Sequence, residues 1–371
     1  MVQPATAAVL RARDQPLRLE QIELPDPGPG QVLVEIAGVG ICHTDFLPSE
    51  GLLPGDWPVV LGHEGAGIVR AVGPSVPGIE VGNHVVLSFD SCGSCLNCRD
   101  GHPAYCDTFF VRNLSGRGTD TPGARDADGR ELAIGWFGQS SFATHALATA
   151  RNVVVIDPSL PLEHLGPFGC GFLTGAGTVT NVLDVQPGRS VAVLGLGGVG
   201  MSGLLAAVQR GASRVVAMDL NPARNELALE LGATHALLVE EPGHLAEALL
   251  TTGGPVDYVF DTTGSAGVIA SALDALAARG TCATVGVQRE NLVLGPRALS
   301  GGKCLTAVYE GDAVPQVHIP GLIHLWRTGR LPVDRLIRSY PLSAANQALA
   351  DMAAGRVIKP VLVPEQAPHE S

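Results

Sequence analysis

Four cysteines lie close together in the chain: Cys92, Cys95, Cys98 and Cys106. Four thiolates at this spacing can surround one tetrahedral Zn²⁺ ion and leave no coordination position open, which is the arrangement of structural zinc sites. An iron–sulfur cluster is a second use of four cysteines. Four incidental reduced thiols are a third, although such dense spacing has few purposes other than metal binding. The residues predict a structural zinc lobe over about residues 90–107.

A second segment has the residue types of a phosphate-binding turn. Its six residues are Gly195, Leu196, Gly197, Gly198, Val199 and Gly200. They follow the apolar run 190–194 and precede a helical pattern over 201–210, the strand–turn–helix context that this motif requires. Gly195 permits the turn, Gly197 lets a pyrophosphate approach the backbone, and Gly200 allows the helix to pack closely on the strand. Glycines that serve only a turn are the alternative.

An acidic residue at the end of the next predicted strand indicates which dinucleotide binds. Asp219 follows the run 214–218, where its carboxylate can accept hydrogen bonds from the adenosine ribose hydroxyls. The same negative charge would repel a 2′-phosphate. The pattern therefore predicts NAD as the cofactor.

Length and composition limit the classes of protein to which these motifs can belong. A chain of 371 residues exceeds the size at which one hydrophobic core usually stops growing, so two domains are expected. Hydrophobic residues make up 46% and charged residues 16%, which is typical of a globular protein. The net charge of −12 gives no electrostatic reason to expect nucleic acid or an anionic membrane as a partner. We expect small-molecule partners.

The sequence also predicts a cytoplasmic protein with reduced cysteines. Arg11, Arg13 and Asp14 interrupt the amino-terminal segment, which is unlike a signal peptide. No run of about 18 apolar residues free of charges or turn formers is present, so no membrane span is expected. In a reducing compartment, eight cysteines favour metal ligation over disulfides.

Two different residue patterns follow one another along the chain. The first 170 residues alternate short β-branched runs, such as 32–36 and 84–87, with Gly and Pro, which favours irregular, mostly β structure. From about residue 182, strand-like runs alternate with alanine- and leucine-rich segments, which is typical of βαβ units in a parallel sheet. This pattern continues to about residue 312, and the tail is expected to return to the first domain.

Further motifs resemble a known family. Gly62-His63-Glu64 is followed by Gly67, Gly73 and Val76, and Cys42-His43-Thr44-Asp45 lies upstream. Together with the cysteine lobe, these motifs resemble the zinc-containing medium-chain dehydrogenases over essentially the whole chain. The resemblance implies an α/β fold. A GroES-like, β-rich catalytic domain would comprise residues 1–171 and 313–371, and a Rossmann domain with a doubly wound parallel sheet would comprise 172–312, with the active site in the cleft.

The resemblance also implies a catalytic zinc with an open position. Its ligands would be Cys42, His63 and Cys170, and water or the substrate oxygen would take the fourth position. Zinc there would lower the pKa of a bound alcohol and stabilise the alkoxide from which hydride departs. Taken singly, each of these residues has an alternative role as an ordinary buried side chain.

Three residues would support that zinc. Thr44 would hydrogen-bond the alcohol oxygen and begin the exit of its proton, because a hydroxyl both donates and accepts. Asp45 would orient His63 by accepting the free ring proton, and Glu64 would have a supporting role beside the metal. Local capping is the alternative for Thr44, and plain solvation is the alternative for both carboxylates.

By the same resemblance, the cofactor contacts extend beyond the glycine turn. They would include His43 and Lys359 at the pyrophosphate, Arg224 at the adenosine ribose, and Val287. Each of the three basic side chains has an alternative role as a solvated group. The cofactors expected are NAD and two Zn²⁺ ions per chain, one catalytic and one structural.

Leu47 departs from the family pattern, because many members have a proton-relay histidine at this position. The relay would then end at water or at His43, and the cleft would be more apolar. The resemblance implies a substrate pocket lined by Leu47, Leu53, Phe89, Trp136 and Phe137. Ordinary core packing is the alternative for these side chains.

The segments 101–106, 137–143, 166–170 and 310–312 most resemble the aryl (benzyl) alcohol dehydrogenase branch. That branch implies reversible, NAD-linked oxidation of bulky primary alcohols, aromatic or allylic, to aldehydes. The resemblance also implies a homo-oligomer, with a dimer favoured over a tetramer.

Two other functions are compatible with the sequence. A thiol-dependent formaldehyde dehydrogenase would use cationic residues at the pocket mouth, such as Arg112, Arg117 and Arg125. A non-catalytic dinucleotide-binding protein is the remoter alternative, because it would not need the three catalytic zinc ligands.

Overall fold

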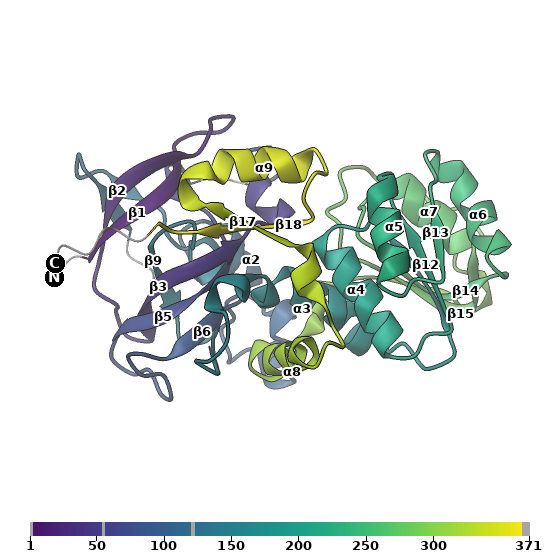
Figure 1. Ribbon diagram of the computed structural model, residues 1–371, viewed down its shortest axis with the longest axis horizontal. Coiled ribbons are helices and arrows are strands. Elements are labelled where there is room, and N and C mark those ends of the chain that lie inside the picture. Colours follow the sequence, from purple (N-terminus) through teal and green to yellow (C-terminus); the bar gives the residue numbers. More distant parts are fainter. Residues whose placement is uncertain (1–2, 54–55, 120–122, 366–371) are drawn as a thin grey trace. The chain divides into compact units, whose positions relative to one another are not determined.

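The chain forms two structural units, each built around its own sheets (Figure 1). The computed structural model describes residues 3–53, 56–119 and 123–365. The first unit comprises Met1–Cys170, Val314–Ile323 and Asp334–Ser371, and the second comprises Gly171–Ala313 and His324–Val333. The segment His324–Val333 thus groups with the second unit, within the tail that the sequence assigned to the first domain.

Two largely antiparallel sheets make up the first unit. One has the strand order β4-β1-β2-β7-β8, and the other has the order β10-β6-β5-β3-β18-β17, with β9 also paired to β3. The strands are β1 (Gln3–Leu10), β2 (Arg18–Leu24), β3 (Gln31–Gly40), β4 (Val59–Val60), β5 (Glu64–Val72), β6 (His84–Leu87), β7 (Ala124–Asp126), β8 (Glu131–Leu132), β9 (His145–Thr149), β10 (Val153–Ile156), β17 (Ile337–Pro341) and β18 (Lys359–Val363).

Strand β3 is the centre of the second of these sheets. Its Val-rich sequence suits a pleated surface, and Val34, Ile36 and Val39 are buried. It pairs antiparallel with β5 and β9, and with β18 near its end. Strands from distant parts of the sequence therefore meet where β3 ends.

Six parallel strands form the sheet of the second unit. They are β11 (Ser190–Leu194), β12 (Arg214–Met218), β13 (His235–Leu237), β14 (Val256–Asp261), β15 (Leu276–Thr284) and β16 (Cys304–Ala307). Their spatial order is β13-β12-β11-β14-β15-β16. This order is that of a doubly wound dinucleotide-binding sheet, whose direction of winding reverses between β11 and β14. The predicted α/β fold class, with its Rossmann unit, is confirmed.

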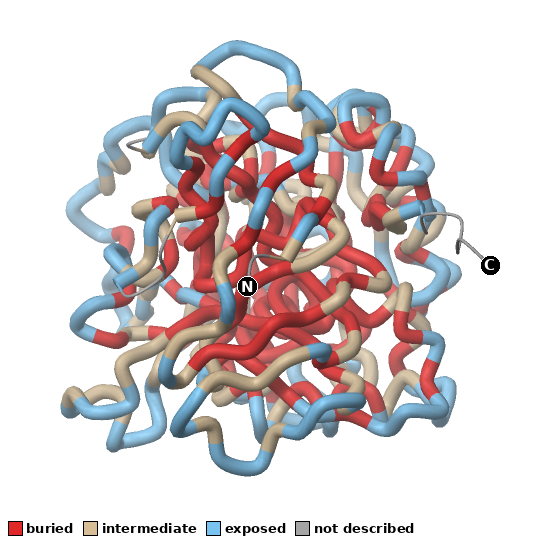
Figure 2. The backbone as a smooth tube through the Cα atoms, turned by 90° about the vertical axis from the view of Figure 1, so that its left-hand side faces the viewer, coloured by how far each residue is buried: buried red, intermediate tan, exposed pale blue. Residues whose placement is uncertain are grey.

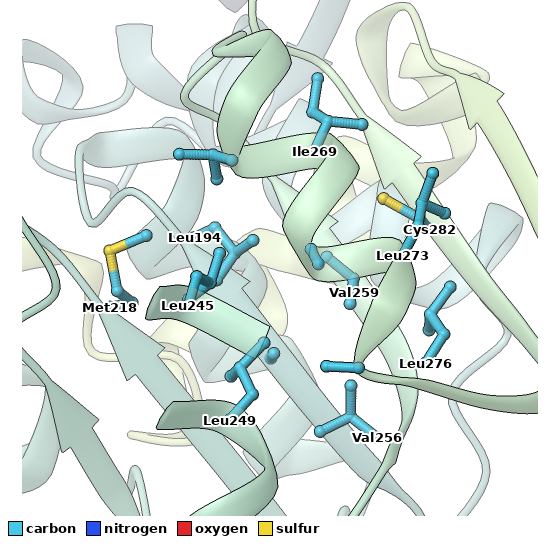
Figure 3. Packing of buried hydrophobic residues seen from close by; sticks show 14 of the residues in the cluster. Leu194, Met218, Leu245, Leu249, Val256, Val259, Ile269, Leu273, Leu276 and Cys282 are labelled. Atoms are coloured by element: carbon cyan, nitrogen blue, oxygen red, sulfur yellow. The ribbon is translucent and has the colours of Figure 1, made fainter. Parts of the chain in front are cut away.

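The helices, short 3₁₀ turns apart, are as follows: α1 (Leu96–Arg99), α2 (Phe109–Leu114), α3 (Gly171–Gly177), α4 (Gly198–Gln209), α5 (Pro222–Glu230), α6 (Leu245–Thr251), α7 (Ala266–Asp274), α8 (Pro315–Arg327) and α9 (Ala345–Ala353). Helices α6 and α7 pack on the parallel sheet through an apolar cluster that includes Leu249, Ile269 and Leu273 against Val259 of β14 (Figure 3). Burial is concentrated in the strands, and exposed residues lie mainly in the outer loops (Figure 2). Within the described residues, no helix has the length and apolar character needed to cross a membrane.

Candidate active site and metal centres

Four side chains with metal-binding atoms meet inside the first unit. The ligand atoms of Cys42, His63, Glu64 and Cys170 all lie within 4.8 Å of one another. The register between β3 and β5 places Gly40 opposite Glu64, which brings the loop that follows β3 next to the residue that precedes β5. Cys170 reaches the same place from the end of the 3₁₀ turn η5 (Gly166–Gly169).

The chemistry of this cluster fits a zinc ion. His63 is buried, and among the described residues its Nε2 atom has no hydrogen-bond partner. A buried ring nitrogen without a partner is costly, and coordination to a metal satisfies it. The neighbouring Cys170 and His63 side chains lower the pKa of the Cys42 thiol well below its usual range, despite the opposing effect of burial. Thiolates and a neutral imidazole are the ligands that zinc prefers.

Asp45 holds the imidazole of His63 in place. Its Oδ1 atom accepts hydrogen bonds from His63 Nδ1 at 2.7 Å, Trp136 Nε1 at 2.9 Å and the Gly62 amide at 3.1 Å. Its Oδ2 atom accepts a bond from the Cys42 amide at 3.2 Å. Because Nδ1 donates to a carboxylate, Nε2 is the nitrogen left for a metal. The structure therefore gives Asp45 the contact that its predicted role requires.

Glu64 forms a buried ion pair with Lys359 at the start of β18. Lys359 Nζ lies 2.9 and 3.0 Å from the two Glu64 oxygens and 3.0 Å from the Ile41 carbonyl. Burial disfavours the ammonium, but Glu64 and the thiols of Cys42 and Cys170 outweigh this effect and raise the pKa of Lys359. All three Lys359 donors have acceptors. The predicted contact of Lys359 with a pyrophosphate would require one of these bonds to break.

The four clustered cysteines form a second potential metal site. The sulfurs of Cys92, Cys95, Cys98 and Cys106 lie within 4.8 Å of one another. The amide of Cys95 donates to Cys92 Sγ at 3.2 Å, and the amide of Cys92 donates to Cys106 Sγ at 3.3 Å. The backbone and hydroxyl of Ser94 also donate to Cys92 and lower its pKa to about 5. Four converging sulfurs supplied with amide donors suit a closed tetrahedral site.

The glycine turn of the second unit has the geometry that its sequence predicts. Gly195 has a φ of +86°, and a Cβ at Gly200 would lie 1.9 Å from the Gly195 carbonyl oxygen, so both positions require glycine. Gly197 is the N-cap of α4, with open space where a side chain would be. The backbone amides of the first turn of this helix are suited to binding a phosphate.

Asp219 lies beside that turn. Its Oδ2 atom accepts a hydrogen bond from the Leu196 amide at 2.7 Å, and its Oδ1 atom accepts one from the Asn221 amide at 2.8 Å. Arg224 Nη1 lies 3.4 Å from the same carboxylate, which places two predicted ribose contacts together. Val287 is 50% exposed, and His43 lies directly after Cys42 in the turn η1 (His43–Phe46).

Two family models match separate parts of the chain. Residues 28–158 match the alcohol dehydrogenase GroES-like domain, and residues 198–316 match the zinc-binding dehydrogenase model. A geraniol dehydrogenase from Castellaniella defragrans is 45% identical, and the match covers 97% of each chain. This chain belongs to the zinc-binding alcohol dehydrogenase family. Membership implies zinc and NAD(H) as cofactors.

Two further relatives of this zinc-binding alcohol dehydrogenase are named for different activities. The crystal structure of benzyl alcohol dehydrogenase from Acinetobacter calcoaceticus has a TM-score of 0.91 at 38% identity, covering 98% of this chain and 100% of that chain. An S-(hydroxymethyl)glutathione dehydrogenase from Synechocystis is 34% identical over 96% of this chain and 98% of its own.

The predicted substrate-pocket residues of this alcohol dehydrogenase are mostly buried. Leu47, Phe89, Trp136 and Phe137 are each less than 8% exposed, and Leu53 is half-buried. A cavity of about 200 Å³ also reaches Asp45, but none of these five residues lines it. The lining residues are Leu10, Gln15, Leu17, Asp45, Phe46, Ser49, Leu61, Phe142, Asn346 and Leu349.

Three contacts in the alcohol dehydrogenase site were not predicted from the sequence. Trp136 donates to Asp45, and the Phe137 ring stacks on His63 with ring centroids 4.3 Å apart and planes 21° apart. The Trp side chain offers a signal for the first contact, because a buried indole N–H usually finds an acceptor. The buried partner of Lys359, Glu64, was the third, and no sequence signal identified it, although Lys359 is one of only two lysines in the chain.

Proposed function

We propose that this protein is an NAD-linked alcohol dehydrogenase that oxidises bulky primary alcohols, aromatic or allylic, to aldehydes and catalyses the reverse reduction. The observation that carries the proposal is the buried His63 imidazole, whose Nε2 atom has no hydrogen-bond partner among the described residues and whose ligand atom lies within 4.8 Å of the Cys42 and Cys170 sulfurs. Two thiolates and one imidazole form a three-ligand set, which leaves a coordination position open for chemistry.

Each of the site residues of the first unit has its own role in this reaction. Zinc, when bound, supplies the positive charge that lowers the pKa of an alcohol and polarises an aldehyde carbonyl. Cys42, His63 and Cys170 hold the ion, and Asp45 fixes the imidazole ring through Nδ1. Thr44, whose hydroxyl lies 3.7 Å from Cys42 Sγ, relays the alcohol proton to water or to His43, since a hydroxyl can accept one hydrogen bond while it donates another.

The second unit binds NAD in this proposal. The pyrophosphate lies at the Gly195–Gly200 turn, where the start of α4 stabilises its negative charge. The Asp219 carboxylate accepts from the adenosine ribose hydroxyls and repels a 2′-phosphate, with Arg224 beside it. His43, Val287 and Lys359 remain proposed cofactor contacts, and Lys359 exchanges one of its present bonds to act as one.

The substrate class is supported by the activities for which two relatives are named and by one substitution. Geraniol is an allylic primary alcohol and benzyl alcohol an aromatic one, and both give conjugated aldehydes. Leu47, which is buried, stands where a relay histidine was expected and makes its surroundings apolar. We place Leu47, Leu53, Phe89, Trp136 and Phe137 around the substrate.

A substrate panel tests this proposal. Initial rates with benzyl alcohol, geraniol and ethanol, each with NAD and with NADP, should give the highest kcat/KM for an unsaturated bulky alcohol with NAD. A highest value for ethanol would refute the substrate class, and equal values for NAD and NADP would refute the role of Asp219.

The formaldehyde alternative has less support from the contacts of its expected cationic residues. Arg112 is paired with Asp90, and Arg117 is paired with Asp56 and Glu131, so two of the three charges are already balanced. Arg125, the third, donates to the Gly129 carbonyl. Formaldehyde with glutathione or mycothiol belongs in the same panel, because a relative acts on S-(hydroxymethyl)glutathione by name. A kcat/KM for such an adduct above that for geraniol would favour this alternative.

The edge of the parallel sheet supports a homodimer. Among the described strands, β16 pairs only with β15, which leaves one row of backbone groups without a strand partner. Two copies of β16 paired across a two-fold axis would satisfy both rows. Light scattering on the zinc-loaded protein should give a dimer mass, and a monomer mass at micromolar concentration would contradict this assembly.

A further inference from the structure

A strained turn lies against the candidate catalytic site. In the turn that contains η3 (Trp136–Gly138), Phe137 has a φ of 51° and Ser140 has a φ of 49°. Side chains other than glycine rarely adopt this left-handed conformation, and such residues gather at functional sites when the surrounding structure holds them there. Hydrogen bonds hold this turn in its conformation, and its side chains in turn contact Asp45 and His63.

Hydrogen bonds fasten the turn to the segment that carries His63. Ser140 Oγ accepts from the Trp136 amide at 2.9 Å and donates to the Val60 carbonyl at 2.6 Å. Gln139 Nε2 donates to the His63 carbonyl at 2.9 Å, and Gln139 Oε1 accepts from the Gly65 amide at 3.1 Å. The turn is thereby fixed to the backbone on both sides of the imidazole.

The two aromatic side chains of the turn then contact the Asp45–His63 pair. Trp136 Nε1 donates to Asp45 Oδ1 at 2.9 Å, the same oxygen that accepts from His63 Nδ1. The Phe137 ring lies nearly parallel to the imidazole, 4.3 Å from it. The two aromatic rings also meet edge to face, with centroids 5.5 Å apart. The hydrogen bond fixes the carboxylate, and the stacked ring fixes the plane of the imidazole.

We propose that Trp136 and Phe137 are positioning residues, which hold the Asp45–His63 pair so that His63 Nε2 faces the Cys42 and Cys170 sulfurs. This inference rests on the proposed zinc chemistry of that cluster. It assigns the two rings a role besides lining a substrate pocket. Outer partners of a metal-binding histidine set its tautomer and orientation, and their removal typically lowers metal affinity or activity by about 10–100-fold.

The variant Trp136→Phe tests the proposal, because it keeps an aromatic ring and removes the N–H donor. Zinc transfer from the holoenzyme to a chromogenic chelator should show two phases, one for each site. We expect the phase of the Cys42–His63–Cys170 site to be at least about tenfold faster in the variant, with the four-cysteine phase unchanged. The cobalt-substituted variant should also show a shifted visible absorption band.

A purely substrate-lining role gives a different result. Trp136→Phe would then change KM for bulky alcohols while zinc transfer and the cobalt spectrum stayed as in the parent, and this outcome would overturn the proposal. Zinc transfer is measured without any alcohol. Faster zinc transfer in the variant, combined with no alcohol oxidation by the parent, would therefore refute the proposed function and leave the positioning role standing.

Two controls separate positioning from general damage. Trp326→Phe removes a half-buried indole from the second unit and should leave both zinc phases unchanged. In a double-mutant cycle, Asp45→Asn with Trp136→Phe should be little worse than Asp45→Asn alone, because Trp136 acts through that carboxylate. Additive effects on zinc transfer would contradict the proposal.

A second variant covers the case in which Trp136→Phe fails to fold. Phe137→Leu removes the ring stacked on His63 and keeps the Trp136–Asp45 bond. We expect it to speed zinc transfer by a smaller factor and to shift the cobalt band, with thermal unfolding close to that of the parent. Unchanged transfer and an unchanged band would remove Phe137 from the proposal.

Discussion

The two metal-binding clusters of this protein are assembled in opposite ways. In the four-cysteine lobe, the ligands come from one short segment, and local amides around Cys92 supply the supporting hydrogen bonds. In the other cluster, Cys42, His63 and Cys170 come from three separate segments, and side chains distant in sequence support them. The first site is specified locally, whereas the second depends on the whole fold of its unit.

We call the Cys42, His63 and Cys170 site the dispersed cluster. Removal of a ligand from it should have the largest effect on activity. His63→Ala takes away the one nitrogen ligand, and we expect a loss of roughly 10³-fold in kcat/KM because a metal contributes several kcal/mol to such chemistry. Metal analysis should find one zinc per chain in the variant and two in the parent. A variant that retains both zinc ions and most of its activity would contradict the role of His63 as a zinc ligand.

Loss of the buried Glu64–Lys359 ion pair, whose lysine is far from the zinc ligands in sequence, should lower the stability of the first unit. Lys359→Met leaves the Glu64 carboxylate buried without its partner, and we expect the free energy of unfolding to fall by about 3–5 kcal/mol. Glu64→Gln combined with Lys359→Met should be less destabilised than Lys359→Met, since no buried charge is left uncompensated. Denaturant unfolding of the three proteins measures both effects, and equal stability of the single and double variants would contradict this account.

The four-cysteine lobe should respond differently to the loss of a ligand. Cys98→Ser should release the zinc of the lobe and lower the thermal midpoint by several degrees, because metal binding contributes directly to folding. The zinc-transfer phase of the dispersed cluster should stay close to that of the parent. Calorimetry and chelator kinetics test the two statements, and loss of both zinc ions would show that the clusters are not independent.

The smallest effect should come from the side-chain donor of the lobe. Ser94→Ala removes a hydroxyl 3.6 Å from Cys92 Sγ but keeps the backbone amide that donates to the same sulfur. We expect zinc transfer from the lobe to change by only about twofold, or ~0.5 kcal/mol. A tenfold change would mean that side chains matter in both clusters, and the contrast between them would disappear.

The same contrast explains what could be predicted from the sequence. The four cysteines and the glycine turn are local patterns, and β11 (Ser190–Leu194) and β12 (Arg214–Met218) occur where the apolar runs predicted strands. The ligands Cys42, His63 and Cys170 were predicted from a resemblance, because their separate positions carry no signal of proximity.

Other features of the site depend on contacts that no local pattern contains. A lysine is usually solvated, and only the pairing of β18 with β3 places Lys359 beside Glu64. Likewise, the indole of Trp136 could have met many acceptors, and the strained turn determines that it meets Asp45. Burial of a polar atom follows from tertiary structure, and sequence spacing does not reveal it.

The position of β18 has a consequence for how the protein matures in the cell. The two residues of the buried ion pair are 295 positions apart in the chain, so Glu64 leaves the ribosome long before Lys359 does. Until the later residue arrives, the carboxylate beside Cys42 lacks its counter-ion. Completion of the catalytic centre therefore follows translation of almost the entire polypeptide, and a nascent chain arrested before residue 359 should remain inactive even where zinc is abundant.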